Sequence, residues 1–297
     1  MFKKKPIIVI TGPTASGKTA LAIKLAKRFN GEIINADSRS IYREMDIATS
    51  KPSIEETKVI PHHLINIVNP DEVFTLSDYQ KLALEKIKEV QSRDKTPFLV
   101  GGTGLYIDAV VYNFNLTETK PDLKLRKKLE KDTIKELAEK LKGIDPESFE
   151  TIDLKNKRRL IRALEVALST KKSFIISQKR ETKPENILYL ALDVEREMLY
   201  QKINQRIDQW LKTGLIEETK YLASKYSFDL PALSAIGYQE ILKYLNNKIS
   251  LEEAAETMKK RTRNYAKRQL TWFKSNKDVV WVNNEGEAEE NIKKFLK

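Results

Sequence analysis

Residues 12–19 read Gly-Pro-Thr-Ala-Ser-Gly-Lys-Thr and lie between two segments of different periodicity. The run before them, Pro6–Ile10, is short and β-branched, as in a buried parallel strand. The apolar residues after them recur at helical spacing, at Ala22, Leu25, Ala26 and Phe29. Glycines in such a loop let successive backbone N–H groups turn inward and hold an anion beside the helix N-terminus.

The pattern therefore predicts a phosphate-binding loop, called the P-loop below. Lys18 would reach the outer phosphates, and the Thr19 hydroxyl would ligate the Mg²⁺ that accompanies them. The predicted phosphate-binding residues are Gly12, Pro13, Thr14, Ala15, Ser16, Gly17, Lys18 and Thr19. The loop alone does not indicate which polyphosphate it binds.

An ATP-hydrolysing P-loop protein has a second apolar strand that ends in an aspartate, which holds Mg²⁺. The sequence shows no aspartate at the end of the candidate strand. The candidate strand Pro97–Val100 runs into the glycine-rich segment Gly101–Tyr106 without an acidic residue. Asp37 instead follows the run Glu32–Ala36, at the sheet edge where the P-loop would lie. A carboxylate in that place is either a metal ligand or a general base.

Eight motifs occur in the order typical of tRNA dimethylallyltransferases, and the chain resembles that family over most of its length. The motifs span residues 12–19, 35–38, 45–52, 61–64, 100–106, 159–165, 235–238 and 266–272. The resemblance implies transfer of a dimethylallyl group from dimethylallyl diphosphate to N6 of the adenosine 3′ of the anticodon. It points to the bacterial form, because eukaryotic members usually append a zinc finger and this chain has no cysteine.

The resemblance also implies roles for individual residues. Asp37 would accept the proton of the attacking adenine amine, which must be extruded from the stem-loop to react. Arg206 would contact the diphosphate, since residues 205–217 match a family pattern around such an arginine, although a solvated arginine is the common alternative. Catalytic roles thus fall on Asp37, Arg206 and, through Mg²⁺, Thr19. Predicted tRNA contacts are Asp37, Ser38, Arg39, Ser40, Thr103 and Arg126, while Ser234 is assigned no role.

The net charge of +12 indicates an acidic macromolecular partner, and the charge is concentrated in two blocks. Residues 155–183 hold ten basic and two acidic residues, and residues 257–277 hold eight basic and no acidic ones. In the first block, a helix with a buried stripe over Leu160, Ile161, Leu164, Ala167 and Leu168 would present Arg158, Arg159 and Arg162 on an adjoining face. We expect these three arginines to bind the anticodon stem-loop, with a solvated basic face as the alternative.

Composition restricts the remaining possibilities. No apolar run is long enough for a membrane span, and the N-terminus lacks the apolar segment of a signal peptide. The absence of cysteine rules out disulfides and thiolate chemistry. The only histidines, His62 and His63, are adjacent, so we expect one packed and one solvated ring and no histidine metal site. We expect a cytoplasmic protein without membrane attachment that acts as a monomer.

The pattern of elements predicts an α/β fold, a P-loop doubly wound, mostly parallel sheet with a helical insertion domain. Expected strands are residues 7–10, 32–35, 64–68, 98–100, 187–192 and 279–282. We divide the chain into a first part of the core (1–116), a helical tRNA-binding insertion (117–186), and a return to the core with basic C-terminal helices (187–297).

Three other functions would explain part of the sequence. A small-molecule P-loop kinase would explain the P-loop but neither the two basic blocks nor the missing strand-end carboxylate. An adenylate isopentenyltransferase shares the chemistry but does not need the basic insertion. A non-catalytic RNA-binding module would explain the charge but not an intact P-loop and Asp37. Transfer of phosphate, prenylation of AMP, or RNA binding without turnover would distinguish them.

Overall fold

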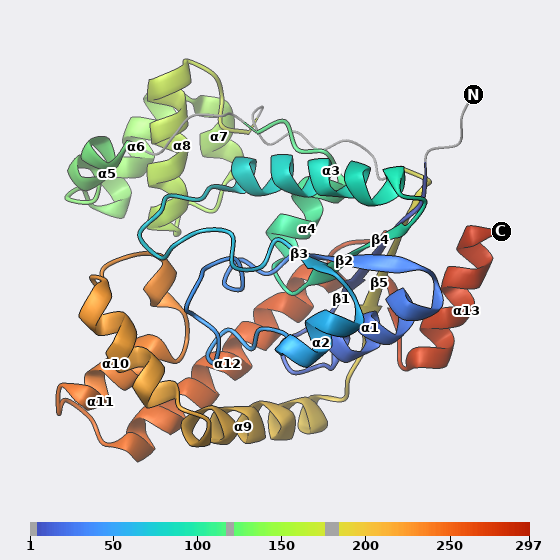
Figure 1. Ribbon diagram of the computed structural model, residues 1–297. Helices are drawn as coiled ribbons and strands as arrows, with labels where there is room; N and C mark the ends of the chain where they lie inside the picture. Colours follow the sequence, from blue (N-terminus) through green and yellow to red (C-terminus); the bar gives the residue numbers. More distant parts are fainter. Residues whose placement is uncertain (1–4, 117–121, 176–183) are drawn as a thin grey trace. The chain divides into compact units, whose positions relative to one another are not determined.

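The computed structural model describes residues 5–116, 122–175 and 184–297. Over these ranges six strands form one sheet with helices around it (Figure 1). The strands are β1 (Ile7–Thr11), β2 (Gly31–Asn35), β3 (His62–His63), β4 (Thr96–Gly101), β5 (Ile187–Leu192) and β6 (Val280–Val282). Their order is β3-β2-β4-β1-β5-β6, and neighbouring strands pair in parallel. This confirms the predicted α/β fold with a doubly wound parallel sheet.

Helices connect the strands and account for most of the chain. They are α1 (Lys18–Arg28), α2 (Ile54–Val59), α3 (Leu76–Ser92), α4 (Gly104–Val111), α5 (Leu123–Leu129), α6 (Ile134–Ile144), α7 (Pro146–Thr151), α8 (Lys157–Thr170), α9 (Arg196–Lys212), α10 (Leu215–Lys225), α11 (Tyr238–Leu245), α12 (Leu251–Lys274) and α13 (Glu285–Leu296). A 3₁₀ turn, Ala232–Ser234, precedes α11. Among the described residues no helix combines the length and apolar character needed to cross a bilayer.

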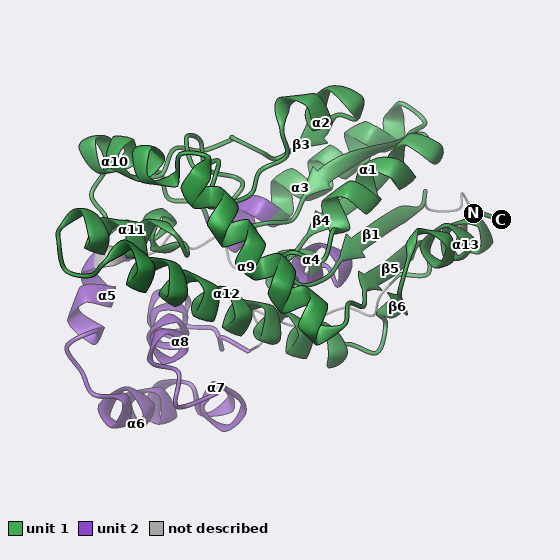
Figure 2. Cartoon of the chain, turned by 90° about the horizontal axis from the view of Figure 1, so that it is seen from below, with its two compact units in different colours: residues 1–74, 80–107, 183–297 green, residues 75–79, 108–182 purple. Residues whose placement is uncertain are grey.

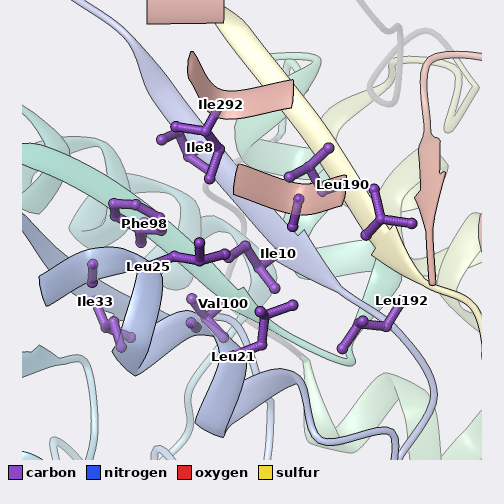
Figure 3. Packing of buried hydrophobic residues seen from close by; sticks show 14 of the residues in the cluster. Ile8, Ile10, Leu21, Leu25, Ile33, Phe98, Val100, Leu190, Leu192 and Ile292 are labelled. Atoms are coloured by element: carbon purple, nitrogen blue, oxygen red, sulfur yellow. The ribbon is translucent and has the colours of Figure 1, made fainter. Parts of the chain in front are cut away.

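The central strands β1, β2 and β4 are buried along almost their whole length because both faces of the sheet are covered. All five residues of β1 are buried, as expected for a strand in the middle of a parallel sheet. One face packs against α1 and α13 through a cluster that includes Ile10, Leu25 and Ile292 (Figure 3). Figure 1 shows α3 over the other face, where Gln91 donates hydrogen bonds to the carbonyls of Lys5 and Pro6. This packing fixes the carboxyl ends of β1, β2 and β4, from which the site is built.

The expected strand over residues 64–68 is wrong. The third strand is His62–His63, which pairs with β2 at Ile33 and Ile34. Leu64 and Asn66 have φ values of 61° and 57°, in the left-handed region, so the backbone cannot continue as a strand. Apolar residues in this segment instead pack in a loop cluster with α9 to α12.

The two histidines are both half-buried, so the expectation of one packed and one solvated ring is also wrong. His62 Nδ1 lies 2.7 Å from the carbonyl oxygen of Ile60. His63 Nε2 lies 2.6 Å from a carboxylate oxygen of Glu32, a buried residue that Arg93 and Lys95 also contact. Burial alone would raise the pKa of Glu32, but hydrogen bonds from these three partners lower the pKa to about 2. Glu32 therefore stays ionised, and neither histidine belongs to a metal cluster among the described residues.

The chain divides into two compact units, shown in Figure 2. The first unit comprises residues 1–74, 80–107 and 183–297, and includes the whole sheet. The second comprises residues 75–79 and 108–182. The start of the predicted insertion, residues 117–121, lies outside the described residues, as do residues 176–183.

The second unit has its own hydrophobic core. Buried side chains of α5, α6 and α8 form it, including Leu129, Leu141 and Leu164. The helices begin at defined caps, since Thr133 makes a capping box with Glu136 at α6 and Asn156 caps α8. This core holds α8, with its basic residues, in a fixed place within the unit.

Candidate active site

The P-loop joins β1 to α1 and has the backbone conformations that the sequence predicts. Gly12 and Gly17 have φ values of 149° and 89°. A Cβ on Gly12 would approach Ser16 Oγ to 3.0 Å, so the close approach as well as the φ value requires glycine there. Gly17 is the N-cap of α1 and no side chain caps the helix. The first N–H groups of α1 therefore remain available for an anion.

Two helices from the C-terminal third of the chain support the P-loop. Ala15, with φ 65°, packs against Leu199 and Ile203 of α9 and Ala266 of α12. Gln269 of α12 accepts a hydrogen bond from the backbone N–H of Thr14 at 2.7 Å. The same amide donates to the carbonyl oxygen of Gly102 at 2.8 Å. Gln269 is buried, so it links the P-loop to the segment after β4 through two fixed contacts.

Two cationic side chains lie at the P-loop. Lys18 Nζ donates to the carbonyl oxygen of Pro13 at 3.3 Å. Burial lowers the pKa of Lys18 to about 8, against the opposing effect of Asp37, and Arg206 lowers it further. Arg206 projects from α9 and donates to Thr14 Oγ1 at 3.3 Å. It is half-buried, so the solvated alternative does not hold for Arg206.

Asp37 follows β2, and a local turn fixes its carboxylate. Its Oδ1 accepts a hydrogen bond from the backbone N–H of Arg39 at 2.8 Å. Asn35 holds the turn from the other side, accepting from the N–H of Asp37 and donating to the carbonyl of Leu64. Asp37 is half-buried and lines the same cavity as Lys18. One carboxylate oxygen is thus anchored by the backbone, and the carboxylate faces the space above the P-loop.

The loop after β2 is tied to the glycine-rich segment after β4. Thr103 Oγ1 accepts a hydrogen bond from the N–H of Ser38 at 3.0 Å, and the N–H of Thr103 donates to the carbonyl of Ala36. A Cβ on Gly101 would lie 2.1 Å from the carbonyl oxygen of Ala36, so only glycine fits at this crossing. β4 ends without a carboxylate, as the sequence predicts.

Arg39 and Ser40 belong to the same loop but have different environments. The Arg39 guanidinium donates to the carbonyl oxygens of Pro231 and Ala232 and to Ser234 Oγ, at 2.7, 3.0 and 3.1 Å. Ser234, to which no role was assigned, is thus a partner of Arg39. Ser40 is buried, and both Arg39 and Ser40 line the cavity.

A cavity of about 660 Å³ in the first unit brings these groups together. Its walls include Thr14, Lys18, Thr19, Asp37, Ser38, Arg39, Ser40 and Arg206. Apolar side chains, among them Ile33, Ile65 and Trp210, form another part of the wall. A cavity lined by cations, a carboxylate and apolar side chains suits an amphiphilic diphosphate and a second, proton-donating substrate.

The oxygen ligands available around the P-loop suit a Mg²⁺ ion that is held mainly by a bound diphosphate. Thr19, half-buried on the first turn of α1, offers one hydroxyl oxygen at the cavity wall. No group of three or more histidine or acidic residues capable of holding a metal occurs among the described residues. Mg²⁺ commonly takes one or two protein oxygens and fills its octahedron with phosphate and water.

The predicted tRNA-binding arginines of the second unit differ from one another. Arg158 and Arg159, on the first turn of α8, are exposed. Arg126 and Arg162 both form ion pairs with the buried carboxylate of Glu165, at 2.7 and 2.5 Å. The stripe of α8 is buried as predicted at Leu160, Ile161, Leu164 and Ala167. The prediction is wrong at Leu168, which is 46% exposed near the C-terminal end of the helix.

Gln269 and the cavity-lining residues of α12 had no predicted role, although residues 266–272 form one of the family motifs. The cavity-lining residues are Arg261, Thr262, Asn264, Tyr265 and Arg268. A signal was present, because the buried stripe of α12 reads Met258, Thr262, Ala266, Gln269 and Phe273. The amide of Gln269 in this mostly apolar stripe indicates buried hydrogen-bonding partners, which are Thr14 and Gly102.

Comparison with known proteins gives consistent results. Residues 40–276 match a family model described as IPP transferase. A tRNA dimethylallyltransferase of Acetivibrio thermocellus is 46% identical over 300 residues, covering 98% of this chain and 96% of that protein. One from Bacillus velezensis is 45% identical over 287 residues, covering 94% and 91%.

Solved structures agree with the sequence relatives. A tRNA isopentenylpyrophosphate transferase of Bacillus halodurans superposes with a TM-score of 0.74 at 42% identity, covering 99% of this chain and 96% of that one. A eukaryotic dimethylallyltransferase described as acting on tRNA has a TM-score of 0.81 at 30% identity, covering 98% and 77%. Both likenesses extend over nearly all of this chain.

Proposed function

The chain belongs to the IPP transferase family, and on that premise we propose that it transfers a dimethylallyl group from dimethylallyl diphosphate to tRNA and releases diphosphate. The acceptor is N6 of the adenosine 3′ of the anticodon. One observation carries the proposal. Lys18, Arg206 and Asp37 line a single cavity, while β4 ends without the carboxylate of an ATP-hydrolysing protein.

The P-loop holds the diphosphate of the donor. Negative charge accumulates on the leaving oxygens as the allylic carbon–oxygen bond breaks, so fixed donors stabilise the transition state more than the bound donor. The N–H groups of α1, the Lys18 ammonium and the Arg206 guanidinium are such donors. Thr19 would hold Mg²⁺, which supplies further charge neutralisation on the diphosphate when bound.

Asp37 acts on the other reactant. The N6 amine of adenine forms the new carbon–nitrogen bond and must lose a proton, which the Asp37 carboxylate accepts and passes to solvent. The bond from carbon to the bridging oxygen breaks, and its electron pair leaves with diphosphate. The hydrogen bond from the N–H of Arg39 keeps the carboxylate oriented during this step.

Both units supply surfaces for tRNA. In the first unit Ser38, Arg39, Ser40 and Thr103 would contact the extruded adenosine, with Arg261 and Arg268 of α12 beside the same cavity. In the second unit Arg126, Arg158, Arg159 and Arg162 would bind phosphates of the anticodon stem-loop. Since tRNA is the acceptor, we place the protein in the cytoplasm, and we expect it to act as a monomer.

Incubation with labelled dimethylallyl diphosphate, Mg²⁺, bulk tRNA, AMP and ATP tests the proposal when the tRNA is separated from free nucleotides before it is digested to nucleosides. We expect label in one modified adenosine and none in free AMP. Label in AMP would favour an adenylate isopentenyltransferase, and phosphate transfer from ATP would favour a small-molecule kinase. RNA binding without any product would indicate a non-catalytic RNA-binding module and would overturn the proposal.

A further inference from the structure

A buried carboxylate lies beneath two of the arginines assigned to tRNA. Glu165 belongs to α8, and its side chain is fully buried, whereas the side chains of Arg126 and Arg162 are 34% and 32% exposed. Burial alone would raise the pKa of Glu165, but hydrogen bonds from Arg126 and Arg162 bring it below its ordinary value. The group is therefore a carboxylate at neutral pH, with one negative charge against two positive ones.

The hydrogen bonds of Glu165 fill its acceptor positions. Oε1 accepts from the N–H of Asp122 at 2.7 Å and from Arg126 Nε at 2.9 Å. Oε2 accepts from Arg126 Nη2 at 2.7 Å and from Arg162 Nη1 at 2.5 Å. A carboxylate offers about four lone-pair positions, so all are used and the geometry of both guanidinium groups is fixed.

The two arginines keep donors directed elsewhere. Arg126 binds Glu165 through Nε and Nη2, which leaves its Nη1 group. Arg162 binds through Nη1, which leaves Nε and Nη2. Within the described part of the chain these remaining donors have no hydrogen-bond partner. A guanidinium held along one edge presents its other N–H groups as a rigid fork that matches a phosphate.

We propose that Glu165 is a positioning residue that holds Arg126 and Arg162 as a preorganised receptor for phosphate groups of the tRNA backbone. This inference rests on the proposed tRNA-modifying function. Two ordered arginines lose less side-chain freedom on binding than two mobile ones, so the same charge binds more tightly. Arg158 and Arg159 provide the contrast, since they are exposed and no ion pair orders them in the described residues.

Two simpler roles predict different results. If Glu165 only neutralises the arginines, removing its charge will strengthen tRNA binding and steepen its salt dependence. If it only stabilises the second unit, removing it will lower the melting temperature and leave tRNA binding unchanged well below that temperature. A positioning role predicts weaker binding with an unchanged salt slope, because the number of cationic side chains stays the same.

The test compares Glu165→Gln with Glu139→Gln, which removes the same charge from an exposed position of α6. Affinity for a labelled substrate tRNA is measured at several salt concentrations, together with melting temperature and the apparent affinity for dimethylallyl diphosphate. We expect roughly 10-fold weaker tRNA binding in Glu165→Gln alone, with the salt slope and donor affinity of the wild type. Wild-type or tighter tRNA binding would overturn the proposal.

A second pair of variants covers the case in which Glu165→Gln does not fold. Arg126→Lys keeps the charge but replaces a two-point contact by a single one, and Arg196→Lys makes the same change at an exposed arginine of α9 that has no proposed substrate contact. We expect weaker tRNA binding from the first and little change from the second, and equal effects would contradict the inference. A wild-type protein that does not prenylate tRNA would count against the proposed function instead, whatever these variants do.

Discussion

At the scale of single residues, the contacts of Asp37 suit the general base that we propose it to be. Its Oδ1 is held by the N–H of Arg39, and Asn35 braces the turn beneath it. Because the neighbouring cations Lys18 and Arg206 come from α1 and α9, the acid–base group and the anion-binding groups lie on separate elements. Each can therefore be changed without removing the other.

Asp37→Asn should reduce single-turnover prenyl transfer by roughly 10²- to 10⁴-fold, the usual contribution of a general base. An asparagine can still accept the Arg39 hydrogen bond through its side-chain oxygen, so the turn should persist and both substrates should bind nearly normally. Rapid-quench measurement with saturating enzyme gives the rate, and filter binding gives tRNA affinity. A wild-type rate would show that a group other than Asp37 accepts the proton of the adenine amine.

Donor affinity should fall as the pH rises above about 8. Burial lowers the pKa of Lys18 to about 8 in the free protein. The side chain is therefore mostly an ammonium well below pH 8 and mostly a neutral amine well above it. A bound diphosphate favours the ammonium form and raises the pKa of Lys18. Above pH 8, Lys18 is therefore protonated in a larger fraction of the complex than of the free protein. The affinity therefore decreases with rising pH, by at most about tenfold per pH unit.

Calorimetry with dimethylallyl diphosphate and Mg²⁺, without tRNA, between pH 7.5 and 9.5 measures this effect. The terminal phosphate is already fully ionised over that range, so it adds no titration of its own. Lys18→Arg supplies the control, since a guanidinium keeps its charge throughout and its affinity should not depend on pH. A flat profile in the wild type would show that Lys18 does not titrate there.

At the scale of elements, α12 links two segments that line the cavity. Gln269 bonds to the P-loop and to Gly102, and a Cβ on Gly104 would meet the Trp272 ring at 2.4 Å. Tyr265 hydrogen-bonds Thr103, and burial raises the pKa of its phenol. One helix thus contacts both the P-loop and the segment next to Asp37.

Gln269→Met should weaken donor binding roughly 10-fold and lower stability by about 1–3 kcal/mol, because the N–H of Thr14 and the carbonyl of Gly102 lose their buried partner. The tRNA affinity should change little, since no charge is removed. Gln201→Met, an exposed change on α9, is the matched control. Denaturant unfolding and donor binding are the measurements, and unchanged donor affinity would mean that the P-loop keeps its shape without Gln269.

At the scale of the whole molecule, the proposed contacts to the donor lie in the first unit alone, whereas the proposed contacts to tRNA lie in both units. All the residues that line the 660 Å³ cavity belong to the first unit. The basic residues of α5 and α8 belong to the second, which has its own core. Changes on the surface of the second unit should therefore affect tRNA binding without affecting the donor.

The double variant Arg158→Ala, Arg159→Ala should bind tRNA more weakly. Its slope of log K against log salt should fall by roughly 0.7 to 0.9 for each phosphate contact that is lost. Donor affinity should match the wild type. Lys135→Ala, an exposed basic change on α6, serves as control. An unchanged slope would mean that these arginines are solvated and do not reach the tRNA.

Local sequence determined the P-loop, the fold class and the apolar stripes of most helices. Glycine positions, β-branched runs and three- or four-residue spacing act through backbone geometry and burial, which operate over a few residues. The same reasoning failed at residues 64–68 and at Leu168. Leu64 and Asn66 have left-handed backbone angles that end the strand, and Leu168 is exposed near the C-terminal end of α8.

Tertiary structure decided the contacts between residues far apart in the chain. Gln269 lies 255 residues from Thr14, and Glu165 lies 39 residues from Arg126, so no local rule pairs them. A buried polar group must find a partner wherever the fold places one, and that place depends on the packing of whole elements. The sequence by itself therefore predicted that residues of the P-loop and Asp37 line one site, whereas the residues that hold them in position could be found only in the folded chain.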